Sequence, residues 1–386
     1  MDFNLSEDQK AYQQAARAFA ENDLAPRAAE WDQCQHFPVD VIRRAGELGF
    51  CGIYSPEAAG GMALSRLDAH LIFEELAYGC TSTAAYITIH NMCTWMVTCF
   101  GSSDTVGEWG PGLTSGEKLA SYCLTEPNAG SDAASLKTSA KKQGDHYALN
   151  GTKCFISGAG ATDVLVVMAR TGGAGAKGIS CLLVPADLPG ISYGRKEEKM
   201  GWNSQPTRTI TFDNVKVPVA NRIGEEGEGF RFAMKGLDGG RINIATCSLG
   251  AAQAALDASQ RYMHERHQFG KSIADFQALQ FKLADMATEL VAARQMVRLA
   301  AFKLDQQDPD ATTYCAMAKR LATDAGFHIC NEALQIHGGY GYIREYPLER
   351  YMRDTRVHQI LEGTNEVMKH IIARRVLMEG ATEVIR

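Results

Sequence analysis

The stretch Tyr-Cys-Leu-Thr-Glu-Pro-Asn-Ala-Gly-Ser-Asp, residues 122–132, lies where the hydrophobic period of the 386-residue chain changes. Before this stretch, apolar residues recur at spacings of three and four, which is the pattern of amphipathic helices. These helices are predicted over 7–20, 39–48 and 67–77. After it the period changes to two, so the stretch marks the passage from a helical region into a sheet.

The predicted strands are short, and turns rich in Gly, Asn and Pro separate them without any helical crossover. We expect strands over 147–149, 164–169, 179–184 and 207–212. The predicted turns lie at 150–151, 171–173, 189–190 and 213–214. Such a succession favours a small antiparallel barrel or sandwich.

Beyond Gly229 the apolar spacing is again that of helices, and three long helices are expected. They cover about 230–266, 276–306 and 310–337. These patterns predict an α+β chain with an N-terminal helical domain, a middle antiparallel β-barrel and a C-terminal four-helix bundle. The expected domains are 1–120, 121–222 and 223–386. A cleft is expected where the barrel meets the helices.

Composition disfavours several classes of protein. A formal charge of −6 supplies no basic field for nucleic acid, and no apolar run is long enough to predict a membrane span. The first residues resemble neither a secretory nor a transit segment, so we expect a cytoplasmic protein, or a mitochondrial matrix protein if this is a mature eukaryotic chain. The eleven cysteines lack metal-site spacing, which predicts reduced core residues and no metal.

Three further motifs follow in the C-terminal part. They are Arg-His-Gln-Phe-Gly at 266–270, Gln-Ile-His-Gly-Gly-Tyr-Gly-Tyr at 335–342 and Ile-Leu-Glu-Gly-Thr-Asn-Glu at 360–366. Each motif alone also suits a polar turn or a glycine-capped helix end. Together with 122–132, and in this order, they resemble the signatures of the acyl-CoA dehydrogenase family. The resemblance implies FAD as cofactor, an acyl-CoA substrate, an electron-transferring flavoprotein as partner and a homotetramer.

The implied reaction removes a proton from the α carbon of an acyl-CoA thioester and a hydride from the β carbon. A weakly acidic C–H bond requires a carboxylate in a water-poor site, and Glu362 holds the family's position for this base. Some members carry the base immediately before the arginine that aligns with Arg241, but here that residue is Gly240. Only one of the two base positions is therefore filled.

The stretches 201–208, 238–245 and 357–363 are similar to those of members that convert isobutyryl-CoA to methacrylyl-CoA in valine degradation. A short straight-chain or 2-methylbutyryl-CoA dehydrogenase, a flavin oxidase and a non-catalytic acyl-CoA-binding scaffold stay open as alternatives. Gly239 and Gly240 are expected to leave room for a branched acyl group. By resemblance the substrate contacts are Ser131, Asp238, Gly239, Gly240, Arg241 and Arg374.

A carboxylate cannot accept a hydride, so the reaction needs a redox cofactor. Residues 224–229, Gly-Glu-Glu-Gly-Glu-Gly, do not form a Rossmann site and their acids would repel a pyrophosphate, which disfavours nicotinamide. The resemblance implies that the flavin half of FAD contacts Tyr122, Leu124, Thr125, Gly130, Ser131, Phe155, Ile156, Ser157, Thr364 and Glu366. For the other half of a neighbouring subunit's FAD, it implies Arg266, Phe269, Phe276, Gln277, Gln335, Gly338 and Gly339.

Overall fold

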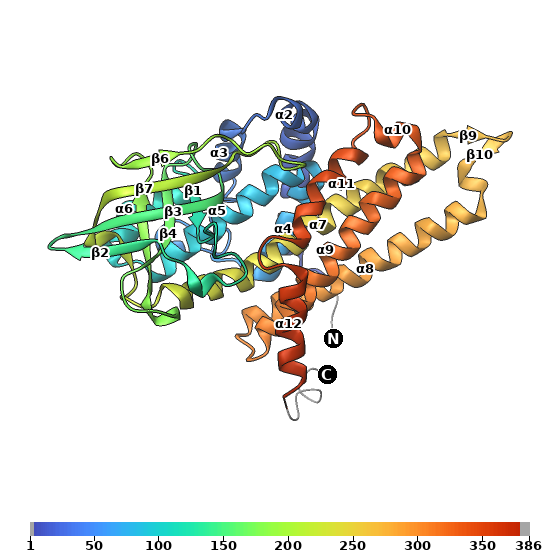
Figure 1. The fold of residues 1–386 in the computed structure, drawn as a ribbon. Coiled ribbons are helices and arrows are strands. Elements are labelled where there is room, and N and C mark those ends of the chain that lie inside the picture. Colours follow the sequence, from blue (N-terminus) through green and yellow to red (C-terminus); the bar gives the residue numbers. More distant parts are fainter. Residues whose placement is uncertain (1–3, 379–386) are drawn as a thin grey trace.

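Helices α1 to α6 form the first region of the computed structural model, which describes residues 4–378 (Figure 1). Ser6 and Ser65 begin α1 and α4 with capping boxes, which satisfy free backbone N–H groups at both helix starts. Helix α5 is buried along almost its whole length, between α4, α7 and β1. The bounds are α1 Glu7–Phe19, α2 Ala28–Cys34, α3 Val39–Glu47, α4 Arg66–Gly79, α5 Thr81–Phe100 and α6 Ser103–Thr114. The helices predicted over 7–20, 39–48 and 67–77 are confirmed.

The middle region is one sheet with the strand order β6-β7-β3-β2-β4-β5-β8, and β1 pairs with β4. Most neighbours are antiparallel, as predicted, but β1 and the end of β2 run parallel to β4. A parallel pair needs a long connection, and the β2–β3 hairpin supplies it for β1 and β4. The bounds are β1 Ala120–Cys123, β2 Ser139–Gln143, β3 His146–Ser157, β4 Val164–Arg170, β5 Ile179–Pro185, β6 Ile191–Tyr193, β7 Thr207–Pro218 and β8 Arg222–Ile223.

Two predicted turns are wrong, because residues 150–151 and 213–214 lie inside the long strands β3 and β7. The two pairs face each other where the register of the ladder shifts. Gly151 and Asn214 have positive φ, and the backbone N–H of Asn214 donates to Asn150 Oδ1 at 2.8 Å. These turn-forming residues therefore build a β-bulge instead of ending the strands. The turns at 171–173 and 189–190 are confirmed.

A period of two does not describe the central strands β4 and β5, which are buried on both faces. Their sequences are accordingly continuous apolar runs. The outer part of β7 shows the alternation of buried and exposed residues that was predicted.

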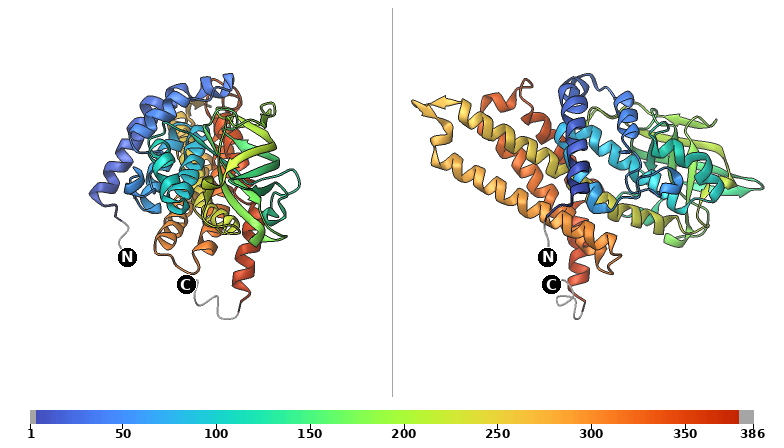
Figure 2. Two further views of the ribbon diagram at one scale, coloured as in Figure 1. Left: turned by 90° about the vertical axis from the view of Figure 1, so that its left-hand side faces the viewer. Right: turned by 180° about the vertical axis from the view of Figure 1, so that it is seen from behind.

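Helix α7, Gly229–Glu265, runs from beneath the sheet to the far tip of the C-terminal helices (Figures 1 and 2). Near its start, Gly229 lies against β5 and Gly236 against α5, and further along α7 packs with α8 and α9. The other bounds are β9 His267–Gln268, β10 Lys271–Ser272, α8 Gln277–Asp305, α9 Ala311–His337, α10 Gly339–Tyr342, α11 Leu348–Arg356 and α12 Asn365–Val376. The three long predicted helices are confirmed within two residues at each end.

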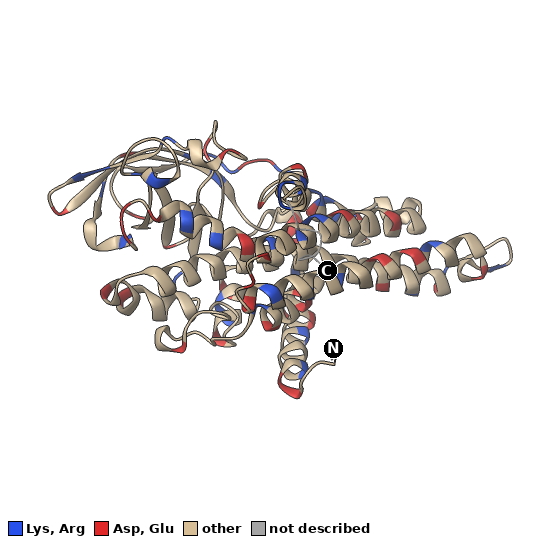
Figure 3. Cartoon of the chain, turned by 90° about the horizontal axis from the view of Figure 1, so that it is seen from below, with Lys and Arg blue, Asp and Glu red and all other residues tan. Residues whose placement is uncertain are grey.

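Figure 3 shows Lys and Arg interspersed with Asp and Glu along the helices, which is consistent with the similar totals of 39 basic and 45 acidic residues. Over residues 4–378, no helix combines the length and the apolar character that crossing a membrane requires.

Candidate functional site

Glu362 lies in the short loop between residues 357–359 and α12, with a positive φ of 56°. Residues with a side chain rarely adopt this conformation, so the surrounding structure must hold it. The carboxylate points at α7, since an ideal Cβ on Gly240 would lie 2.5 Å from Glu362 Oε2. The absent side chain of Gly240 therefore makes room for the carboxylate of Glu362.

Both of the paired glycines of α7 lie against charged side chains. A Cβ on Gly239 would lie 2.6 Å from the guanidinium of Arg66, just as one on Gly240 would meet Glu362. The prediction that the two missing side chains leave room for an acyl group stays a prediction, and in this structure the side chains of Arg66 and Glu362 lie beside the two glycines. A carboxylate on position 240 would approach the point that Glu362 now occupies.

Burial raises the pKa of the Glu362 carboxyl to about 7, although the nearby cations Arg241 and Lys319 oppose the shift. Among the described residues, Oε2 of Glu362 has no hydrogen-bond partner. A carboxylate with few hydrogen bonds and little water around it is more basic than one in solution. With a pKa near neutral, this group is suited to accept a proton from carbon.

Tyr122 and Arg241 lie near this carboxylate and also carry unpaired polar atoms. Tyr122 Oη and Arg241 Nε are buried without a hydrogen-bond partner in residues 4–378. Arg241 Nη1 donates to Asp238 Oδ1 at 2.6 Å, and the hydroxyl of Thr312 donates to Asp238 Oδ2 at 2.7 Å. Because buried polar atoms are rarely unpaired in folded proteins, a cluster of them indicates a ligand-binding site.

The 122–132 stretch is tied to β3 by a buried ion pair. Lys153 Nζ donates to Glu126 Oε1 and to the carbonyl of Leu124, both at 2.8 Å. Glu126 also accepts two backbone N–H groups of the segment that follows. The N–H of Cys154 donates to the carbonyl of Thr125, so the loop has a fixed shape beside β3.

Phe155 projects outward from β3 and is 69% exposed, with a φ of 58°. The ladder with β7 shifts register between Lys153 and Ile156, and this irregularity directs the ring away from the core. An exposed aromatic ring offers a face to a planar ligand. Three other candidates in this region are exposed or partly exposed: Gly130, Ser131 and Ser157.

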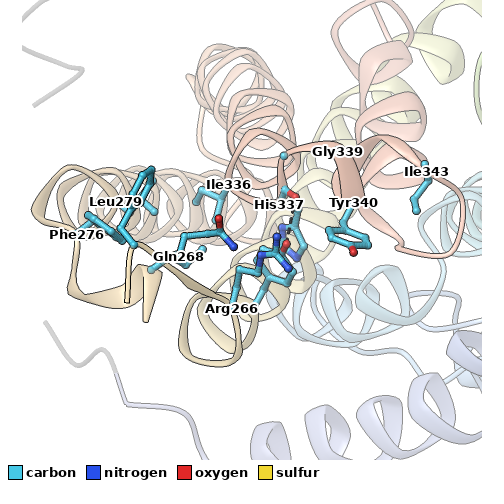
Figure 4. A pocket seen from close by; sticks show the side chains of 13 residues that line it. Arg266, Gln268, Phe276, Leu279, Ile336, His337, Gly339, Tyr340 and Ile343 are labelled. Atoms are coloured by element: carbon cyan, nitrogen blue, oxygen red, sulfur yellow. Dashed lines mark hydrogen bonds between the residues drawn. The ribbon is translucent and has the colours of Figure 1, made fainter. Parts of the chain in front are cut away.

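The second group of candidates lines a pocket of about 610 Å³ at the tip of the C-terminal helices (Figure 4). Figure 4 shows Arg266 near Tyr340, and its guanidinium lies 5.4 Å from the centroid of that ring. Phe269 is 92% exposed. A Cβ on Gly338 or Gly339 would meet nothing within 4 Å, so a ligand can approach the backbone closely there. The predicted residues in the lining are Arg266, Phe269, Phe276, Gly338 and Gly339.

The remaining candidates are less enclosed. Gln277 and Gln335 are exposed near the tip pocket, and Arg374 is exposed in the last turn of α12. Glu366 is exposed in the first turn of that helix. Thr364 caps α12 by accepting the N–H of Val367, so part of its hydrogen-bonding capacity is used within the chain.

The two groups of candidates are far apart in one chain. Gly240 marks the central group and Glu265, next to Arg266, marks the tip. Twenty-five residues of continuous helix separate these positions, a distance of roughly 37 Å at 1.5 Å per residue. The central group has an exposed aromatic ring and unpaired polar atoms that suit a flavin, while the arginine and open glycines at the tip suit a diphosphate.

Three residues near the centre were missed from sequence. Arg66 is the first residue of α4, and its guanidinium lies 3.5 Å from the centroid of the Tyr54 ring. No local sequence pattern predicts a role for this residue. Lys153 and Lys319 are fully buried. Lys319 follows Ala-Met-Ala at 316–318 in a predicted helix, but this run gives no specific signal, because lysine is mostly exposed in folded proteins.

Family models match almost the entire described chain. The acyl-CoA dehydrogenase N-terminal domain matches residues 6–117, the middle domain 121–215 and the C-terminal domain 227–377.

Similar proteins extend over the same length. Mitochondrial isobutyryl-CoA dehydrogenase of Bos taurus is 57% identical over 97% of this chain and 90% of its own. The enzyme of the same name in Dictyostelium discoideum is 54% identical over 96% and 90%. Among solved structures, butyryl-CoA dehydrogenase of Megasphaera elsdenii superposes with a TM-score of 0.95 at 41% identity, over 98% of this chain and all of that one.

The raised pKa of Glu362 predicts that Glu362→Gln stabilises the protein above pH 7. Burying the charged form costs roughly 3 kcal/mol above the folded-state pKa of about 7, and this cost vanishes below the ordinary value of 4.5, where both folded and unfolded states are protonated. Urea unfolding should therefore show a higher midpoint for Glu362→Gln at pH 8 and a much smaller gain at pH 5. Glu57→Gln, at an exposed carboxylate, is the control. Equal gains at both pH values would contradict the assignment of this cost to Glu362.

Proposed function

Because the chain belongs to the acyl-CoA dehydrogenase family and is thus an FAD-dependent oxidoreductase, we propose that it converts isobutyryl-CoA to methacrylyl-CoA. In this reaction the α carbon of the thioester loses a proton, the β carbon loses a hydride and a carbon–carbon double bond forms. When bound, FAD supplies the hydride acceptor. An electron-transferring flavoprotein is the proposed partner that reoxidises the enzyme.

The observation that carries the proposal is the buried, unpaired carboxylate of Glu362 with a pKa of about 7. We assign removal of the α proton to this group. Arg241 and Lys319 favour the charged form of the carboxylate, while burial keeps it more basic than a carboxylate in water. Burial of the Oε2 atom limits the contact of this oxygen with water.

Most of the residues proposed to hold the flavin half come from β1, the loop after it and β3, and Thr364 and Glu366 come from the start of α12. Leu124 and Thr125 come from the loop that Lys153 fixes, and Phe155 offers an exposed ring beside them. Tyr122 has a buried hydroxyl without a hydrogen-bond partner in residues 4–378, so this hydroxyl is free to donate a hydrogen bond to a ligand. These contacts would orient the ring system against the substrate without moving the backbone.

Identity to two isobutyryl-CoA dehydrogenases above 50% supports isobutyryl-CoA as the substrate. A short straight-chain acyl-CoA is the alternative substrate. It has weaker support, because this chain is only 40% identical to the short-chain specific acyl-CoA dehydrogenase of Rattus norvegicus. Degradation of valine is the proposed pathway. A mitochondrial location, as in the names of the two relatives, is proposed if the source is eukaryotic.

The separation of the central and tip groups supports an oligomer as the functional form. Roughly 37 Å of helix between Gly240 and Glu265 exceeds the length of an extended FAD molecule. If both groups contact FAD, they contact two different FAD molecules, and a second copy of the chain must bring its tip to the centre of the first. We propose the homotetramer that is usual in the family.

The test of the main proposal is the Glu362→Gln variant. It should retain bound flavin but reduce the rate of flavin bleaching by isobutyryl-CoA, without oxygen, by roughly 10³-fold, since general-base catalysis contributes on that order. In the wild-type enzyme kcat/KM should rise with pH through about 7, as the carboxylate loses its proton. Full-rate bleaching by Glu362→Gln would defeat the assignment, and purified protein that stays colourless with added FAD would favour a non-catalytic scaffold.

A panel of acyl-CoA substrates tests the substrate assignment. We expect kcat/KM to be highest for isobutyryl-CoA and lower for butyryl-CoA and 2-methylbutyryl-CoA. 2-Methylbutyryl-CoA has one methylene more than isobutyryl-CoA, and a change of one methylene in an apolar pocket alters kcat/KM by about 10- to 200-fold. Butyryl-CoA has the same number of carbons and differs in branching, which changes the shape that the pocket must accept. A preference for butyryl-CoA would reassign the enzyme to straight chains, and prompt hydrogen peroxide without an added electron carrier would identify an oxidase.

The Arg266→Ala variant tests the sharing of FAD between copies. Loss of a charge-assisted contact to a diphosphate should weaken FAD binding by about 10- to 100-fold, because such bonds contribute about 1.5–3 kcal/mol. Retained flavin per chain after gel filtration measures this. Arg261→Ala, an exposed arginine on the same helix, is the matched control. Unchanged flavin retention in Arg266→Ala would remove the support for a shared site.

A further inference from the structure

The loop that carries Glu362 has an unusual backbone. Glu362 and Gly363 both have positive φ, 56° and 86°. Glycine adopts this conformation freely, but glutamate does so only when its neighbours impose it. The contacts that impose it therefore decide where the carboxylate points.

The first such contact comes from Lys319 on α9. Its ammonium group is fully buried and donates to the carbonyl of Gly363 at 2.8 Å and to Asn365 Oδ1 at 2.9 Å. Burying an ammonium group away from water is unfavourable unless it gains such bonds. Both acceptors belong to the Glu362 loop or to the residue that begins α12, so the buried charge of Lys319 acts on this loop.

A second contact comes from Asp324, just over one turn further along α9. Its Oδ1 accepts from Gln359 Nε2 at 2.8 Å and from Asn365 Nδ2 at 2.7 Å. One carboxylate oxygen thus joins the residue before the loop to the residue after it. Thr323 adds a bond from Asn365 Nδ2 to its hydroxyl at 3.0 Å.

We propose that Lys319 and Asp324 are positioning residues that hold the Glu362 loop in the shape needed for proton removal. The proposal rests on the proposed function of Glu362 as the base. Lys319 pulls the carbonyl that follows Glu362 toward α9, and Asp324 fixes the distance between the two ends of the loop. Neither side chain needs to touch the substrate for this effect.

Lys319 also contributes its charge, which has to be weighed against every other group near the base. The groups that face Glu362 are Arg241 from α7, Lys319 from α9, Tyr122 from β1 and Cys93 from α5. Those near Lys319 itself are Asp324, Arg241, Glu366 and His358. Of the groups facing Glu362, Arg241 and Lys319 are the two cations, and both lower its pKa. Removing the charge of Lys319 should therefore raise the pKa of Glu362.

The experiment compares Lys319→Met and Asp324→Asn in the FAD-loaded enzyme. Both variants should lower kcat for isobutyryl-CoA by about 10- to 100-fold, because a displacement near 1 Å of a catalytic group costs that much, while KM changes little. Lys319→Met should in addition shift the acid limb of the kcat/KM profile upward by about 0.5 to 1 pH unit. Asp324→Asn should not shift it upward.

Lys199→Met is the matched control for losing a lysine from the interior. Lys199 donates to the carbonyl of Gln205 and to the hydroxyl of Thr207, and burial lowers its pKa to about 8, as it does for Lys319. This control should leave the acid limb where it is in the wild-type enzyme. A shift equal to that of Lys319→Met would mean that the effect is general and would overturn the proposal.

The remaining outcomes separate this proposal from the proposed function. If the Glu362→Gln enzyme is active, the assignment of Glu362 as the catalytic base is wrong. If Glu362→Gln is inactive while Lys319→Met and Asp324→Asn keep the wild-type kcat and acid limb, only the positioning proposal fails. If Lys319→Met does not fold, Asp324→Asn decides alone: a lowered kcat with bound FAD supports the proposal, and an unchanged kcat overturns it.

Discussion

The Glu362 carboxylate occupies the space of a side chain that α7 lacks, and much of the central region is arranged around this contact. Any Cβ at position 240 would displace the carboxylate, so the helix and the loop must remain in register. The loop is anchored on its upstream side as well. The indole N–H of Trp202 donates to His358 Nε2 at 3.1 Å, and Ser248 Oγ on α7 lies 2.7 Å from His358 Nδ1. Burial lowers the pKa of His358 to about 3, so this buried link between the segment before β7, the residues before the Glu362 loop and α7 is uncharged.

Much of the fold could be predicted because its longest helices have regular apolar spacing. The helices around 230–266, 276–306 and 310–337 appear at nearly those bounds, since each packs one face on the others over many turns. The strands of the sheet were harder to predict from the sequence. Asn150 and Asn214 have the residue type of turns, yet a side-chain to backbone bond between two strands uses them in a bulge. That bond depends on a partner strand some sixty residues away, which local sequence does not reveal.

The candidate site, like the fold, could be predicted from the sequence only in part. Glu362 and Gly240 were both singled out from the sequence, and the structure places them against each other. Whether a missing side chain makes room for a ligand or for another residue depends on tertiary packing. Lys319 and Arg66 have no motif around them, because a single long cation reaches its partners across helices that meet only in the folded protein.

The pKa of Glu362 follows from a balance between desolvation, which raises it, and two nearby cations, which lower it. Arg241 is paired with Asp238 at 2.6 Å, so part of its field is cancelled at the carboxylate. Lys319 bonds to neutral oxygens, which leave its charge uncancelled, although burial lowers its own pKa to about 8. Desolvation of Glu362 outweighs the attraction of the two cations, so the pKa of Glu362 stays near 7. A fully exposed carboxylate would be less basic, and one tightly paired with Arg241 would be less basic still. The Asp238–Arg241 pair therefore matters for basicity as well as for packing.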